Sequence, residues 1–103
     1  MKTYDVHLTD RAENNWREAY EWYAERSREA AEAWYDAMLA TLNSLKHEPE
    51  RCPLADENLR FPTELRQLNF GSGRKITHRV IFSIRPSKVV IYAIRHVAQG
   101  DWD

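Results

Sequence analysis

Two adjacent residue pairs, His78-Arg79 and Arg95-His96, carry the side chains of this sequence that are best suited to chemistry. Histidine transfers protons well because its unperturbed pKa lies near neutrality. The planar guanidinium of arginine binds pairs of phosphate oxygens and stabilises charge that develops on them. The four residues therefore supply the types needed to cleave RNA by attack of a ribose 2′-hydroxyl on its phosphate.

The spacing of these residues argues against a complete catalytic set on one surface. Both pairs fall in segments with β-strand patterns, and neighbouring side chains of a strand point to opposite faces. Only a β-bulge would bring both members of a pair to the same face. Structural roles are the alternative, with His78 at the rim of the core, His96 as a satisfied polar residue at a strand end, and the arginines solvated or salt-bridged. The acids available as partners are Glu64, Asp101 and Asp103.

Other reactive groups give weaker signals. The single cysteine, Cys52, lies beside prolines with no histidine at a recognisable spacing, and His7 and His47 belong to no constellation. One thiol can form neither an internal disulfide nor a zinc cluster, which fits a reducing cytoplasm. The N-terminal segment lacks the long apolar stretch of a signal peptide, and no run approaches the ~18 apolar residues of a membrane span. We expect a cytoplasmic protein with no membrane partner, metal or cofactor.

The first half of the chain predicts a strand followed by two helices. Residues 3–8 alternate in polarity and favour β-structure. Thr9 or Asp10 can cap an amphipathic helix, and Ser27 can begin a second helix that ends before Pro49. The connection between the helices is very short, so they form an antiparallel hairpin. The aromatic residues predicted to lie in the core or the seam between the helices are Trp16, Tyr20, Tyr23 and Trp34.

The second half predicts three strands after an irregular, proline-containing connection over residues 49–62. The strands are expected over residues 64–70, 75–84 and 89–95. Residues 71–73, Gly-Ser-Gly, indicate a turn between the first two strands, and residues 85–88 a hairpin loop between the last two. The last strand is apolar on both faces, which is typical of a central strand.

This order predicts an α+β fold of two layers, strand-helix-helix-strand-strand-strand. The three final strands form an antiparallel meander, and the helical hairpin covers one face of it. The first strand can pair in parallel with the last. A chain of 103 residues has room for one domain, which we expect to span residues 1–103.

Charge is distributed unevenly along the chain. Residues 1–50 hold six Lys or Arg and eleven Asp or Glu, whereas residues 60–96 hold eight Lys or Arg and one acid. A basic stripe of this kind attracts anionic surfaces. The alternative is that these cations only solubilise an exposed face of the sheet.

Three segments, in this order and spacing, resemble the RelE/ParE superfamily of toxins from type II toxin–antitoxin modules. They are Leu65-Arg66-Gln67-Leu68, residues 74–84 (RKITHRVIFSI) and residues 90–99 (VIYAIRHVAQ). The resemblance implies a growth-arresting toxin of the kind associated with plasmid stabilization. It also implies a cognate antitoxin whose segment, disordered when free, folds across the toxin, with acidic groups facing the basic stripe and an apolar helix in the hairpin groove. A higher-order toxin–antitoxin assembly is compatible with this resemblance.

The ParE-like branch, which poisons DNA gyrase, is the favoured interpretation. Members that cut mRNA on the ribosome are usually strongly basic, whereas this chain has a pI near 6.4 and an acidic tail, Gly100-Asp101-Trp102-Asp103. One alternative is a RelE-like, ribosome-dependent mRNA endoribonuclease; another is an inactive relative that acts only as a binding module. The catalytic residues of the endoribonuclease would be His96, Arg79, Arg95 and His78. The residues predicted to bind the target or the antitoxin are Arg66, Arg74, Lys75, Arg79, Arg95 and Trp102.

Overall fold

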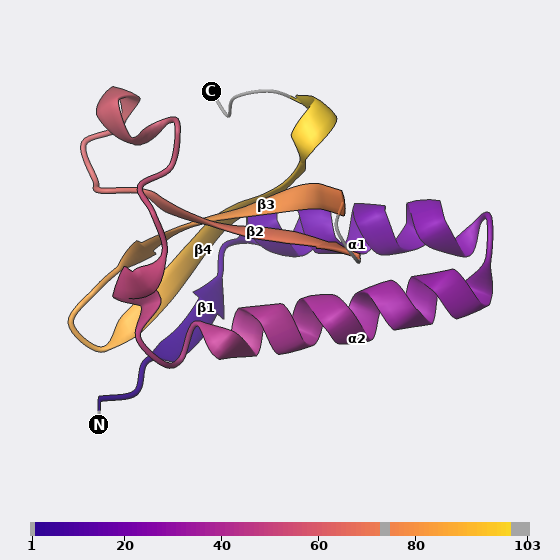
Figure 1. The fold of residues 1–103 in the computed structure, drawn as a ribbon, viewed down its shortest axis with the longest axis horizontal. Coiled ribbons are helices and arrows are strands. Elements are labelled where there is room, and N and C mark those ends of the chain that lie inside the picture. Colours follow the sequence, from indigo (N-terminus) through magenta and orange to yellow (C-terminus); the bar gives the residue numbers. More distant parts are fainter. Residues whose placement is uncertain (1, 73–74, 100–103) are drawn as a thin grey trace.

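The computed structural model describes residues 2–72 and 75–99, and it has two layers, with a helical hairpin packed along one face of a four-stranded sheet (Figure 1). The strands and helices are β1 (Asp5–Leu8), α1 (Asp10–Ala24), α2 (Arg28–Ser44), β2 (Arg66–Ser72), β3 (Lys75–Ile84) and β4 (Lys88–His96). Short 3-10 turns cover Pro49–Arg51, Asn58–Arg60 and Val97–Gln99. The predicted α+β fold and its element order are confirmed.

The sheet has the strand order β1-β4-β3-β2. β1 pairs in parallel with β4, so that Val6 lies opposite Val89, and the other two pairings are antiparallel. The Arg85 amide donates to the Lys88 carbonyl at 2.8 Å and closes the predicted hairpin loop. β4 therefore occupies the central position that its apolar faces predict.

Side-chain caps begin both helices where the sequence predicts. The Thr9 hydroxyl accepts a hydrogen bond from the Ala12 amide at 3.2 Å, and the Ser27 hydroxyl accepts one from the Ala30 amide at 3.1 Å. Each cap satisfies one of the amides that a helix N-terminus leaves without an intrahelical partner. Ser27 lies in the short connection that follows α1, so its cap starts α2 at once, as the antiparallel hairpin requires.

The second helix ends earlier than expected. α2 stops at Ser44, whereas the proline signal placed its end at Glu48-Pro49. Lys46 and His47 form tight turns, and Glu48 adopts a left-handed conformation with φ of 47°. This conformation reverses the chain before the proline, so Pro49 begins a 3-10 turn and does not terminate the helix.

The main core lies between the helices and the sheet. Its buried side chains include Met38 and Leu42 of α2, Phe82 of β3 and Ile91 of β4. The four aromatic residues of the helices lie in the core or against it, as predicted. Trp34 is buried in this core, and Trp16, Tyr20 and Tyr23 pack against it.

The connection over residues 49–62 covers the second face of the sheet, which the sequence did not indicate. Ala55 and the partly buried Phe61 of this connection pack there in a cluster with Leu65, Ile81 of β3 and Ala93 of β4. The predicted irregular structure is confirmed, because this stretch holds only 3-10 turns and one isolated β-bridge. The sheet is thus covered on both faces. The connection helps to bury the second face, a role that its composition did not indicate.

β2 extends further than expected, into the segment predicted to form a turn. Gly71 and Ser72 belong to β2, and residue 73 lies outside the described residues. The register shifts between Phe70 and Gly71, and a Cβ atom on Gly71 would lie 1.9 Å from the Lys75 carbonyl oxygen. The glycine therefore permits a close approach of the two strands and does not mark the turn itself.

Candidate functional site

The two histidines and the two arginines of the predicted catalytic set lie on opposite faces of the sheet. His78 pairs with His96 across β3 and β4, and Arg79 pairs with Arg95. The bulge in this strand pair falls at Ile81, too far along to bring the two sets together. The separation predicted from strand alternation is confirmed.

His78 is buried on the helical side of the sheet. Its ring centroid lies 5.4 Å from that of Trp34 and 6.0 Å from that of Phe70. Burial, followed by the nearby His96, lowers the pKa of His78 from 6.5 to about 4. His78 is only 4% exposed, so the predicted position at the rim of the core is wrong: Trp34 of α2 and Phe70 of β2 pack against it. The imidazole is neutral at pH 7.

His96 ends β4 and is exposed to solvent. Its ring lies 5.2 Å from that of His78, nearly edge-on, and its Nδ1 accepts a hydrogen bond from the Ala98 amide at 3.1 Å. An acceptor Nδ1 carries no proton, so the neutral ring is protonated at Nε2. The prediction of a satisfied polar residue at the end of a central strand is confirmed.

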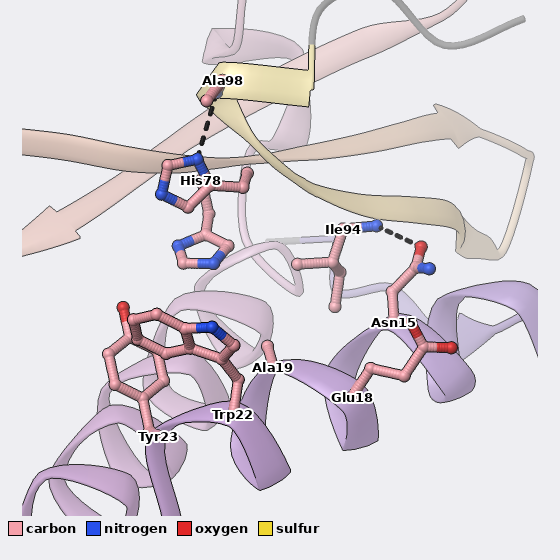
Figure 2. Close-up of a pocket in the computed structure, with 9 residues that line it drawn as sticks. Asn15, Glu18, Ala19, Trp22, Tyr23, His78, Ile94 and Ala98 are labelled. Atoms are coloured by element: carbon pink, nitrogen blue, oxygen red, sulfur yellow. Dashed lines mark hydrogen bonds between the residues drawn. The ribbon is translucent and has the colours of Figure 1, made fainter. Parts of the chain in front are cut away.

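Both imidazoles line a pocket of about 410 Å³, here called the α1–β4 pocket (Figure 2). Asn15 fastens α1 to β4, since its Oδ1 accepts a hydrogen bond from the Ile94 amide at 3.0 Å. Of the described lining residues, Glu18 is the single Asp or Glu, and none is Lys or Arg. The lining residues are Asn15, Glu18, Ala19, Trp22, Tyr23, His78, Ile94, His96 and Ala98.

Sequence reasoning missed the helical wall of this pocket. Asn15, Glu18 and Trp22 recur at intervals of three and four residues, which places them along one side of a helix. The spacing could have shown that these residues share one side of the helix, but it does not identify the side of α1 that faces a cavity. Only the packing of β4 against α1 identifies it.

The opposite face of the sheet contains a buried ion pair. Arg79 donates from Nη2 to Oε2 of Glu57 at 2.7 Å and from Nη1 to Oε1 at 3.0 Å. The Gln67 side-chain oxygen accepts a further bond from Arg79 at 3.1 Å. Glu57 is 0% exposed and Arg79 is 7% exposed. Nothing in the sequence singled out Glu57 as this partner.

Arg66 and Arg79 form salt bridges, as the structural alternative to catalysis predicted, but only one of their partners was expected. Arg66 pairs with Glu64 at 3.1 Å, as the sequence allowed, and its Nη1 also donates to the Cys52 carbonyl at 2.7 Å. Arg79 pairs with Glu57, which was not among the predicted acids. Asp101 and Asp103 lie outside the described residues.

The remaining residues predicted to bind the target or the antitoxin differ in solvent exposure, and two of them lie outside the described residues. Lys75 is exposed on β3, and Arg95 is partly exposed on β4. Arg74 and Trp102 lie outside the described residues. Because Arg66 and Arg79 hold the connection against the sheet, the basic stripe is not one continuous open surface.

Metal, thiol and membrane chemistry find little support in the described parts of the chain. They contain no group of three or more His, Cys, Asp or Glu side chains placed to hold a metal ion. Cys52 is buried, and burial raises the pKa of its thiol, which keeps it protonated at neutral pH. Within the same residues, none of the helices has the length and apolar character needed to span a membrane.

Comparison with known families agrees with this architecture. A search of curated proteins found no match. A family model described as "ParE toxin of type II toxin-antitoxin system, parDE" matches residues 6–100, which include every helix and strand except the first residue of β1. The chain therefore belongs to the ParE toxin family of type II toxin–antitoxin systems, within the RelE/ParE superfamily that its strand motifs resemble.

Proposed function

We propose that this ParE-family toxin arrests growth by poisoning DNA gyrase, trapping the enzyme on cleaved DNA, and that its cognate antitoxin neutralises it by covering the toxin. Poisoning of this kind requires the toxin to bind a partner enzyme and requires no catalytic group on the toxin. Family membership supports the antitoxin as a partner. We further propose that the toxin acts in the cytoplasm, where gyrase works.

The separation of imidazole from guanidinium is the observation that favours gyrase over RNA. Cleavage of RNA needs proton-transfer groups and charge-stabilising donors around the same phosphate. His78 and His96 share a pocket whose described lining contains Glu18 and no Lys or Arg. A carboxylate there repels phosphate, and His78, with a pKa of about 4, has no proton to donate as an acid at pH 7.

The guanidinium on the other face is also poorly placed for phosphate binding. The fork of Arg79 holds Glu57 in the bidentate geometry that it would offer a phosphate. Of the predicted contact residues, we propose that Lys75 and Arg95, which keep solvent exposure, reach the target or the antitoxin, together with Arg74 and Trp102.

Two parallel assays test the proposal. Purified toxin is added to gyrase with relaxed plasmid DNA, and separately to translating ribosomes that carry mRNA. We expect loss of supercoiling with accumulation of cleaved DNA, intact mRNA, and recovery of supercoiling when the antitoxin encoded beside the toxin is added.

Substitutions at histidine separate the alternatives. His96→Ala removes the exposed imidazole of the pocket, and His47→Ala is the matched control, because His47 is exposed but does not line the pocket. Cleavage of A-site mRNA that His96→Ala abolishes and His47→Ala preserves would overturn the proposal in favour of an endoribonuclease. Absence of activity in both assays, with no growth arrest on expression, would leave an inactive binding module.

A further inference from the structure

We propose that the α1–β4 pocket binds an arginine side chain presented by a protein partner. This inference goes beyond the choice of gyrase as target and does not depend on it. It rests on the shape of the pocket, on its charge and on its aromatic wall.

The pocket has a neutral floor and a polar rim. Ile94 and His78 are buried at its base, with Ala19 and Tyr23 half-buried beside them. Glu18 lies at the exposed rim (Figure 2). A side chain entering from solvent would lay an aliphatic stem over the floor while its charged end stays near the carboxylate. Long cationic side chains bury their stems in this way.

The charge of the pocket selects a cation. The titratable groups that face it are Glu18 and Tyr23 from α1, His78 from β3 and His96 from β4. Within the described part of the chain, the Glu18 carboxylate makes no ion pair and no side-chain hydrogen bond. An anionic ligand would meet this carboxylate without any compensating Lys or Arg in the described lining.

The aromatic wall selects a planar cation. Glu18 and Trp22 stand four residues apart on α1, so both positions lie on the side of the helix that lines the pocket. The Trp22 ring already holds one guanidinium, that of Arg26, whose Cζ lies 3.6 Å from the ring centroid. Trp22 lines the pocket, whereas Arg26 is not among the described lining residues. The Tyr23 ring stands edge-on to the Trp22 ring, with 5.1 Å between the ring centroids.

These features favour arginine over lysine and over a nucleotide. Guanidinium is flat and weakly hydrated, stacks on aromatic rings and pairs with a carboxylate through a rigid fork. An ammonium ion is more strongly hydrated and stacks less well. A nucleotide could place its base against Trp22, but its phosphate would meet Glu18.

Titration of the full chain with capped peptides tests this assignment. The probes are acetyl-Ala-Arg-Ala-amide, the same peptide with citrulline as a neutral isostere, the same peptide with lysine, and guanosine. NMR follows the ring signals of His78, His96 and Trp22. We expect saturable shifts with the arginine peptide, with binding about tenfold weaker for citrulline because the ion pair and the cation–π contact are lost.

Matched substitutions on one helix locate the site. Glu18→Gln should weaken binding of the arginine peptide about threefold, as expected for loss of one exposed charge pair. Glu21→Gln is the control, because Glu21 is also exposed on α1 but pairs with Arg17 and is not among the described lining residues of the pocket. Glu18 lacks a side-chain partner among the described residues, so its substitution should leave folding intact, which circular dichroism can verify.

Several outcomes would overturn the inference. They are equal binding of the arginine and citrulline peptides, no saturable shift with the arginine peptide, tighter binding of guanosine, and an equal effect of the two glutamate substitutions. The gyrase assay reads a separate property, so either proposal can fail while the other stands.

Discussion

Glu57→Ala should be among the most destabilising substitutions in the described part of the chain. The change removes a fully buried carboxylate and leaves the 7% exposed Arg79 guanidinium without its bidentate partner. Gln67 retains its hydrogen bond to Arg79 but supplies no negative charge. A buried cation that has lost its anion carries a desolvation penalty that is no longer offset.

The expected magnitude follows from burial and geometry. Breaking a buried ion pair on one side destabilises a protein by about 3–5 kcal/mol. For a chain near 100 residues, each kcal/mol lowers the melting temperature by roughly 4–8 °C, so the loss should be about 15 °C or more. With a urea m-value of about 1.5 kcal/mol/M, a loss of about 4 kcal/mol shifts the unfolding midpoint by roughly 2.5 M.

Urea unfolding followed by circular dichroism measures this loss, with Glu64→Ala as the matched control. Glu64 also pairs with an arginine of the sheet, Arg66, but its side chain is 62% exposed, so its loss should change the free energy of unfolding by less than about 1 kcal/mol. The double variant Glu57→Met/Arg79→Met should recover most of the stability, because an apolar pair of similar volume replaces both charges.

Two results would refute this reasoning. One is a loss for Glu57→Ala no larger than that for Glu64→Ala, since burial would then give the pair no special weight. The other is a double variant whose loss of stability equals the sum of the losses for Glu57→Met and Arg79→Met, which would show no coupling between the two side chains.

Three further predictions concern the core, a helix cap and the β2–β3 pair. The pKa of His78 is lowered from 6.5 to about 4, so the unfolded chain takes up this proton first as the pH falls; the free energy of unfolding should drop between about pH 6.5 and 4, and His78→Gln should flatten that slope in urea midpoints measured against pH. Thr9→Ala should lose about 1 kcal/mol by removing the bond to the Ala12 amide, whereas Thr9→Ser should keep most of it; equal losses would contradict the cap. Gly71→Ala places a Cβ 1.9 Å from the Lys75 carbonyl oxygen, so its melting temperature should fall clearly, and an unchanged value would show that the strands can separate freely there.

Local features were predictable because they depend on near neighbours in the chain. Thr9 and Ser27 cap the helices through hydrogen bonds three residues away. Strand alternation placed the two members of each pair, His78-Arg79 and Arg95-His96, on opposite faces, and the observed pairing agrees. The end of α2 was predicted less well, because the left-handed Glu48 overrode the proline signal.

The contacts that only the tertiary structure could reveal join residues that lie far apart in the sequence. Glu57 and Arg79 are separated by 22 positions, and their pairing needs the connection over residues 49–62 to fold onto the second face of the sheet. Asn15 and Ile94 are separated by 79, and their bond brings α1 to β4 and forms the pocket. The sequence alone thus determined the family, the order of elements and the separation of each His-Arg pair across the sheet. The protonation state of His78 and the contribution of the Glu57–Arg79 pair to stability both depend on desolvation. Desolvation is a property of the packed molecule, so the sequence alone could not give either one.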